Sequence, residues 1–153
     1  MKEFIIISVG KLKEKNILEL ERDYLLRIQN PTLKIVEVKS HAEDLLAEGK
    51  EVMKTLALLG KEGAVQPILL AEKGQLHKDS QHFSQWLFEQ MASYDRLAFI
   101  IGGASGHSPE LYKESHGLLS LSPLTFPHKL ARLLLIEQLY RAQSIKSNHP
   151  YHK

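Results

Sequence analysis

The sequence contains no cysteine among its 153 residues, which excludes disulfides and thiolate metal sites. Its apolar runs are too short to span a bilayer, so no membrane segment is expected. The N-terminal stretch MKEFIIISVG carries one lysine, and its apolar run ends at Gly10 and Lys11. That pattern favours a first strand over a signal peptide. Together these absences indicate a cytoplasmic protein.

The sequence also has little excess of positive over negative charge, because its net charge is only +2. The basic residues are nevertheless unevenly placed. From His128 to the C-terminus there are five basic residues and one acid, Glu137. Such an end can meet RNA phosphates, although a solvated helix face explains the same charges equally well.

Apolar segments and amphipathic segments alternate along the chain. The apolar runs predict strands at residues 3–9, 33–38, 67–71, 97–101 and 117–122. Helical spacing predicts helices at 16–28, 41–59 and 79–94, a short helix opened by Ser108-Pro109, and a last helix from Pro127 to about Ser147. This order predicts an α/β fold with a mostly parallel sheet and helices on both faces. With no repeat or linker, residues 1–153 are expected to form a single domain.

In a parallel sheet of this kind, ligands bind outside the carboxyl ends of the strands. The loops after Ala71, Ile101 and Ser122 are therefore the candidates. The second of these is rich in glycine, in the stretch IIGGASG. Neither a dinucleotide fingerprint after the first strand nor a phosphate-binding P-loop is present. Two interpretations remain: Gly102 and Gly103 let a flat ring approach the backbone, or they form a tight turn that needs positive φ.

The loop LSPLTFP, residues 121–127, is unusual because Pro123 and Pro127 hold it extended. A rigid loop with free carbonyl and amide groups suits the edge of an adenine ring. A plain strand-to-helix connection with Thr125 near the helix cap is the alternative.

Four stretches together resemble a known family: IIISVGKLKEK, IIGGASG, LSPLTFPHKLARLLLIEQLYRAQSI and the terminal NHPYHK. In this order they resemble the bacterial RlmH family of SPOUT-class methyltransferases, over nearly the whole chain. The resemblance implies an α/β fold whose C-terminal segment forms a trefoil knot, a rare exception to unthreaded chains. It also implies a homodimer whose active site lies near the subunit interface.

The resemblance further implies S-adenosylmethionine as cofactor. Its expected contacts are Leu70, Gly102, Leu121, Ser122, Pro123, Leu124, Thr125 and Phe126, to which the glycine argument adds Gly103. The implied substrate is a pseudouridine in a hairpin loop (helix 69) of 23S rRNA, methylated at N3 on the assembled 70S ribosome. The chain departs from the family pattern in two places. The family pattern has an acid directly after Leu70, but this chain has Ala71 there and Glu72 one residue later. The family often has an apolar residue after Gly106, where this chain has His107.

A pseudouridine N3 carries a proton at neutral pH, so the chemistry needs a group that removes it or favours its loss. His152 is the first candidate base, because the pKa of histidine lies near working pH. Glu137 is the second, and Arg141 four residues later is placed to pair with it. The same pair is also explained as a structural ion pair that fixes the last helix. Tyr151 is a candidate to stack on the target base.

Four basic side chains are candidates for contacts with RNA: His128, Lys129, Arg132 and Lys153. The His149-x-x-His152 spacing lacks a third ligand, so no metal site is expected. Two other functions stay open from the residues. One is a ribosome-binding or RNA-binding module without catalysis, and the other is a different α/β enzyme such as a nucleotide hydrolase.

Overall fold

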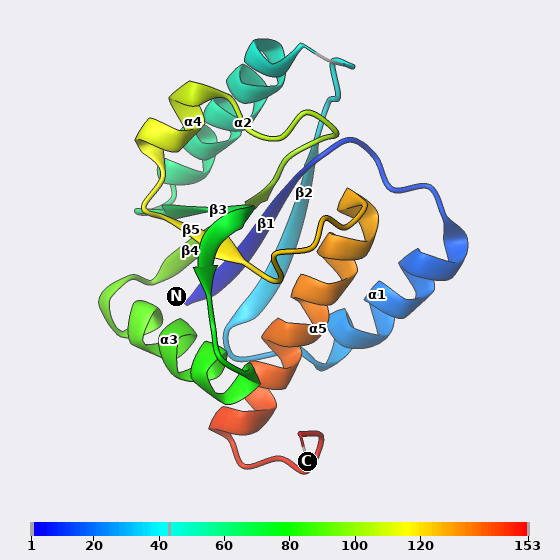
Figure 1. The fold of residues 1–153 in the computed structure, drawn as a ribbon. Coiled ribbons are helices and arrows are strands. Elements are labelled where there is room, and N and C mark those ends of the chain that lie inside the picture. The colour runs from blue at the N-terminus through cyan, green and yellow to red at the C-terminus, as the bar shows by residue number, and fades with distance from the viewer. Residues whose placement is uncertain (1, 43, 153) are drawn as a thin grey trace.

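The computed structural model describes residues 2–42 and 44–152, and Figure 1 shows their arrangement. The strands are β1 (Glu3–Val9), β2 (Thr32–Val38), β3 (Gln66–Leu76), β4 (Arg96–Ile101) and β5 (Gly117–Ser120). The helices are α1 (Lys15–Arg27), α2 (Leu45–Gly60), α3 (Ser80–Ser93), α4 (Pro109–Glu114) and α5 (His128–Lys146). The expected alternation of strands and helices is therefore confirmed.

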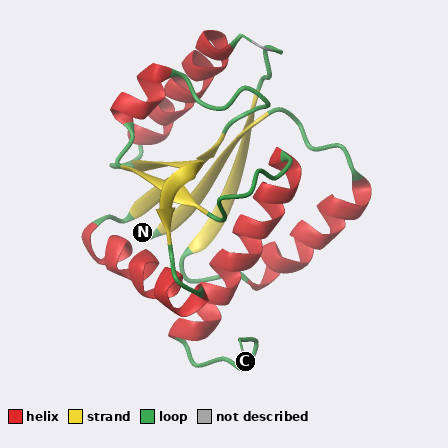
Figure 2. Ribbon diagram, in the orientation of Figure 1, coloured by secondary structure: helices red, strands yellow, loops and turns green. Residues whose placement is uncertain are grey.

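The five strands form one sheet in the order β2-β1-β4-β3-β5, and every neighbouring pair is parallel. Parallel strands buried on both faces have continuous apolar sequences, and β1 and β4 are buried along almost their whole length. Alternate residues of each strand point to opposite faces. Phe4 and Phe99 pack into the core below α1, α3 and α5, whereas Ile5 and Ile100 pack towards α2 and α4. Figure 2 shows these two helical layers on either side of the sheet.

Two boundaries differ from the expectation by more than two residues. The helix predicted from residue 41 begins at Leu45, because Asp44 is its N-cap and its carboxylate accepts from the backbone N–H of Ala47 at 3.1 Å. Ala42 has a φ of +54°, which no helix residue adopts. The third strand runs to Leu76 rather than Ala71, with an irregularity between Leu70 and Gln75 where it pairs with β5.

The loops that follow β1, β2, β4 and β5 all lie at one end of the sheet (Figure 1). The start of α5 lies at the same end, so this edge collects segments that are far apart in the sequence. The trefoil knot implied by the family resemblance stays a prediction. Within the residues that the structure describes, no helix combines the length and apolarity needed to cross a bilayer.

Candidate functional site

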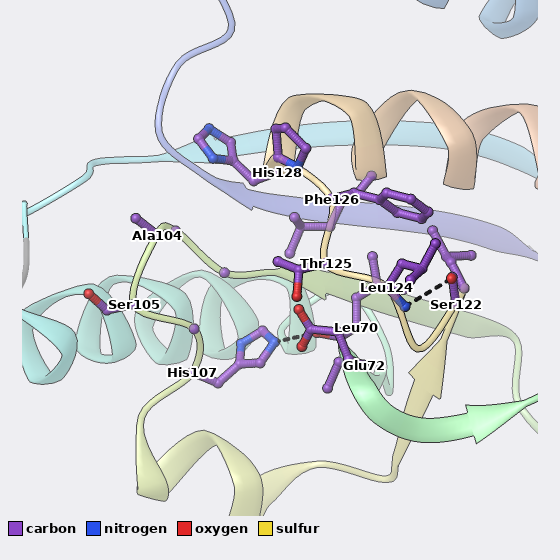
Figure 3. A pocket seen from close by; sticks show the side chains of 18 of the residues that line it. Leu70, Glu72, Ala104, Ser105, His107, Ser122, Leu124, Thr125, Phe126 and His128 are labelled. Carbon is purple, nitrogen blue, oxygen red and sulfur yellow. Dashed lines mark hydrogen bonds between the residues drawn. The ribbon is translucent and has the colours of Figure 1, made fainter.

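A cavity of about 690 Å³ opens at this edge of the sheet, between the end of β3, the glycine loop and the β5–α5 loop (Figure 3). Eight of the nine residues predicted to contact a cofactor line it: Leu70, Gly102, Gly103, Leu121, Ser122, Leu124, Thr125 and Phe126. Pro123 is not among the lining residues. The volume lies within the range of roughly 300–1,000 Å³ typical of small-molecule sites.

The glycine loop owes its composition to close backbone contacts. A Cβ on Gly102 would lie 2.5 Å from the carbonyl oxygen of Gly106. The backbone N–H of Gly106 donates to the carbonyl oxygen of Gly103 at 3.1 Å, which closes the turn. Of the three glycines in this loop, only Gly106 has positive φ, at +83°. Gly106 supplies the left-handed turn and Gly102 permits its close approach, so these contacts favour the tight-turn interpretation, while both glycines also line the cavity.

A buried carboxylate lies directly behind this loop. A Cβ on Gly103 would lie 3.2 Å from Oε1 of Glu48, a residue of α2 that is only 3% exposed. The other carboxylate oxygen, Oε2, accepts from Ser40 Oγ and from the backbone N–H of His41, both at 3.0 Å. Glu48 thus ties the loop after β2 to the wall of the cavity.

Short-range hydrogen bonds hold the β5–α5 loop, which bends at Leu121, Pro123 and Leu124 and does not run extended as predicted. The hydroxyl of Ser120 donates to the carbonyl oxygen of Ser122 at 3.0 Å, and Ser122 Oγ accepts from the backbone N–H of Leu124 at 3.0 Å. The Leu124 side chain is 68% exposed at the mouth of the cavity. The loop therefore presents mostly backbone and apolar atoms rather than charged side chains to a ligand.

His107 lines the cavity and was not predicted as a site residue. It is 8% exposed, and its Nε2 lies 2.8 Å from the carbonyl oxygen of Leu70 (Figure 3). Because a carbonyl only accepts, Nε2 carries the proton and Nδ1 is left with a lone pair. Nδ1 is buried and has no hydrogen-bond partner among the described residues. Burial lowers the pKa of His107, although the Leu70 carbonyl and Glu72 act against this shift. The signal was the departure from the apolar family pattern at this position.

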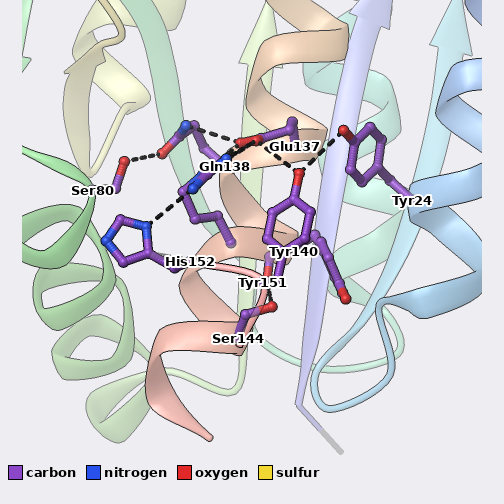
Figure 4. A network of polar contacts seen from close by, with 9 residues as sticks. Tyr24, Ser80, Glu137, Gln138, Tyr140, Ser144, Tyr151 and His152 are labelled. Carbon is purple, nitrogen blue, oxygen red and sulfur yellow. Dashed lines mark hydrogen bonds and ion pairs between the residues drawn. The ribbon is translucent and has the colours of Figure 1, made fainter. Parts of the chain in front are cut away.

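The four predicted catalytic side chains meet in a second place, where Tyr24 joins them. We call this group the tail network: Tyr24, Glu137, Arg141, Tyr151 and His152 (Figure 4). Arg141 Nε donates to Glu137 Oε1 at 3.0 Å, which confirms the expected pair four residues apart. Arg141 Nη1 lies 3.1 Å from Nδ1 of His152. The Tyr151 hydroxyl donates to Glu137 Oε2 at 3.4 Å and lies 3.2 Å from the Tyr24 hydroxyl.

These contacts define the protonation states in the tail network. A guanidinium only donates, so Nδ1 of His152 accepts and its proton sits on Nε2. The hydrogen bond with Glu137 raises the pKa of Arg141, and burial raises the pKa of Tyr151 with the Tyr24 hydroxyl adding to the shift. In this arrangement both candidate bases, Glu137 and His152, already use their lone pairs within the network.

Within one chain the tail network does not reach the cavity. Ala131 lines the cavity, whereas Arg141 lies ten residues further along the same helix, α5. A rise of 1.5 Å per residue places their backbones about 15 Å apart. The cavity therefore lies at the N-terminal end of α5, whereas the tail network extends from the middle of the helix, at Glu137, towards its C-terminal end and lines no part of the cavity.

The structure overturns one of the predicted RNA contacts. The Arg132 side chain is only 6% exposed, and its Nε lies 2.8 Å from Glu21 Oε2 while Nη1 lies 2.7 Å from Glu37 Oε2. Burial alone would lower the pKa of Arg132, but the hydrogen bonds with the two carboxylates outweigh it and raise the pKa. The guanidinium joins α5 to α1 and β2 and is not available to a phosphate.

The other predicted RNA contacts have different surroundings. His128 is exposed and lines the mouth of the cavity. Lys129 forms an ion pair with Glu14 at 3.0 Å. Lys153 lies outside the described residues. Among residues 2–42 and 44–152, no group of three or more histidine and acidic side chains is arranged to hold a metal ion.

A family described as "Predicted SPOUT methyltransferase" matches residues 2–152. Proteins named "Ribosomal RNA large subunit methyltransferase H" from Acholeplasma laidlawii and Bacillus cytotoxicus are 41% and 40% identical to this chain. The alignments cover 97% of this chain in both cases, and 97% and 98% of those proteins.

Solved structures with low sequence identity share the fold. A probable methylase family protein from Haemophilus influenzae has a TM-score of 0.56 at 13% identity, over 98% of this chain and 70% of that one. The SpoU methyltransferase AviRb from Streptomyces viridochromogenes, in complex with AdoMet, has a TM-score of 0.52 at 13% identity, over 91% of this chain and 57% of that one.

Proposed function

This chain belongs to the SPOUT methyltransferase family, and on that premise we propose that its cavity binds S-adenosylmethionine for methyl transfer to ribosomal RNA. At the coarser level, the chain is a methyltransferase of large-subunit ribosomal RNA, like the full-length relatives that it matches. At the finer level, we propose that the acceptor is N3 of a pseudouridine in a hairpin loop of 23S rRNA. The proposed substrate particle is the assembled ribosome.

The cavity fits this cofactor by three observations. Its volume suits an adenosyl group with an amino-acid tail. Gly102 and Gly103 line it without a side chain, so a flat ring can approach their backbone. His107 keeps an acceptor nitrogen without a partner in the same wall. The observation that carries the proposal is the convergence of the glycine loop and the β5–α5 loop on one cavity.

When bound, the cofactor supplies an electrophilic methyl group on a positively charged sulfur, so the chain's own task is to bind, orient and exclude water. The apolar side chains of Leu70, Leu121 and Phe126 line the cavity and reduce its water content. Glu72 is the acid that lines it, which suits a cationic ligand. The acceptor nitrogen must lose its proton as it takes the methyl group.

The tail network is the proposed source of help with that proton. The charge of Arg141 favours the anionic form of an imide placed beside it. His152 acts as the base only when its bond to Arg141 opens, because Nδ1 is otherwise occupied. Tyr151 presents an aromatic ring, and Arg141 lies 4.9 Å from the centre of that ring.

Since the tail network lines no part of the cavity within one chain, we propose a homodimer in which the tail network of one subunit faces the cavity of its partner. Leu130 and Leu134, on one side of α5 near the cavity, are 41% and 42% exposed. Leu124 adds apolar surface at the mouth. An exposed apolar patch of this kind is typical of an interaction surface.

Methyl transfer is tested by incubating the protein with radiolabelled S-adenosylmethionine and ribosomes that lack the modification. Nucleoside analysis of the 23S rRNA should then detect 3-methylpseudouridine. Ribosome binding without any transfer would instead favour the non-catalytic module. Failure to bind the cofactor in calorimetry would contradict the proposed function altogether.

The composite site is tested by mixing two inactive variants. Gly102→Trp blocks the cavity, and deletion of residues 151–153 removes the tail. Half of the randomly mixed dimers are mixed, and each of these has one complete site, so the mixture should recover about a quarter of wild-type activity. If each subunit works alone, the mixture stays inactive.

A further inference from the structure

Two loops beside the cavity carry four exposed lysines. Lys11 and Lys13 follow β1, Lys15 begins α1, and Lys39 follows β2. All four side chains are exposed, and none takes part in an ion pair between residues of the described ranges. We call these four residues the lysine rim.

The backbone holds the lysine rim in place. Leu12, between two of the lysines, is 8% exposed, and its N–H donates to Glu37 Oε2 at 2.9 Å. Burial of Leu12 turns its two neighbours outward. The backbone N–H of Gly10 donates to the carbonyl oxygen of Val38 at 2.8 Å, which joins this loop to the one that carries Lys39.

Both loops touch the wall of the cavity at Gly103. A Cβ on Gly103 would lie 3.4 Å from Cγ1 of Val9, one residue before the first loop. Glu48, whose carboxylate packs against the same glycine, accepts hydrogen bonds from Ser40 and His41 in the second loop. The lysine rim therefore starts one strand spacing, about 4.8 Å, from the glycine loop.

The acids near the lysine rim are engaged elsewhere. Glu37 pairs with Arg132, Glu14 pairs with Lys129, and Asp44 caps α2. The first turn of α1 has no acid and begins with Lys15, and the acid at this end of the helix is the N-cap residue Glu14, which pairs with Lys129. Because Glu14 and Glu37 are paired with other cations, the rim carries an excess of positive charge in a protein whose net charge is only +2.

We propose that the lysine rim binds the phosphate backbone of the RNA that carries the target base, an inference that builds on the proposed function. Lysine suits this role, because phosphate contacts fix the position of an RNA without reading its sequence. The contacts lie on the rim of the cavity rather than on the buried Arg132, which explains how the chain attracts RNA with so small a net charge. Two RNA contacts predicted from the sequence lie close by: His128 lines the same opening, and Lys129 pairs with Glu14, which lies between Lys13 and Lys15.

The test uses the full chain and measures binding without any methyl donor. The triple variant K11Q/K13Q/K39Q is compared with the wild type for binding to 70S ribosomes and to protein-free 23S rRNA, between 50 and 200 mM salt. The matched control, K54Q/K61Q/K113Q, removes three exposed lysines of α2, its C-cap and α4. Cofactor affinity, measured by calorimetry, serves as the check that each variant is folded.

The rim variant should bind both RNA targets roughly 100-fold more weakly at 0.1 M salt, and its salt dependence should lose a slope of about 2. The control variant should bind like the wild type. Equal binding by the rim variant and the wild type would overturn the proposal, as would equal weakening by the two triple variants. Loss of binding to ribosomes but not to protein-free rRNA would also overturn it, because the partner would then be a ribosomal protein. If the protein transfers no methyl group but its RNA binding still depends on the rim, the proposed function fails and this proposal stands.

Discussion

The groups gathered at the two ends of α5 differ in chemical character. At its N-terminal end the cavity is walled largely by backbone, glycine and apolar side chains. Towards its C-terminal end the tail network consists of ionisable and hydroxyl side chains bonded to one another. The first is suited to hold a flat ligand and the second to handle charge. This division is the reason why we propose a composite site formed by two subunits.

The largest expected effect comes from breaking the tail network while leaving the cavity intact. Glu137→Gln removes the carboxylate that binds Arg141 and Tyr151. We expect methyl transfer to fall at least about 100-fold, the usual scale for loss of an acid–base group. Cofactor affinity should not change. Glu19→Gln, at an exposed position of α1, is the control, and an equal loss in both variants would contradict the role of the network.

The converse variant breaks the cavity and spares the network. Gly102→Ala would bring a Cβ to 2.5 Å from the Gly106 carbonyl oxygen. The turn must shift, so we expect about 1–3 kcal/mol of destabilisation and at least about tenfold weaker cofactor binding. Calorimetry and urea unfolding measure both quantities. Gly117→Ala is matched, since its Cβ would meet no atom within 4 Å. If the two alanine variants behave alike, the close approach at Gly102 is unimportant.

A smaller change sharpens the comparison within the tail network. Tyr151→Phe removes the hydroxyl that contacts Glu137 and Tyr24 but keeps the ring. We expect a loss of about 1 kcal/mol in unfolding free energy, the usual net value of a hydrogen bond. If the ring stacks on the target base, transfer activity should survive in Tyr151→Phe and fall in Tyr151→Ala. Equal activity in the two variants would remove the stacking role.

The smallest expected effect concerns His107 and pH. Burial lowers the pKa of His107 in the folded protein below its ordinary value of 6.5. The unfolded chain therefore takes up the proton more readily as the pH falls below about 6.5, so acid destabilises the folded state through this residue. His107→Phe should show a flatter decline in unfolding free energy between pH 7 and pH 5. A decline as steep as in the wild type would show that the buried imidazole does not titrate in this range.

Much of the fold follows from local sequence, because burial on both faces forces continuous apolar strands. The run of residues 97–101 is an example, and Ser108 is an N-cap as predicted, with its Oγ accepting from the backbone N–H of Leu111 at 3.4 Å. The start of α2 was predicted wrongly, since an apolar periodicity does not reveal the positive φ of Ala42. The extension of β3 was missed for a related reason. Gly74 packs against the backbone of β5, a contact between distant segments.

The candidate site was predictable where it depends on backbone and not where it depends on distant partners. Glycine and proline spacing identified both loops of the cavity. Arg132 was assigned to RNA because its burial depends on Glu21 and Glu37, which lie about a hundred residues earlier in the chain. The sequence did not reveal the separation of the tail network from the cavity either, because this separation depends on the direction of α5 relative to the sheet.

One uninterrupted helix of 19 residues sets the spacing between the two ends. The helix fixes the distance between the cavity and the tail network, so it tolerates substitutions better than a change in length. A substitution on the outer side of α5 changes one contact, whereas inserting a single residue rotates everything beyond it by about 100° and advances it by about 1.5 Å. Variation in this segment is therefore constrained in register far more than in composition.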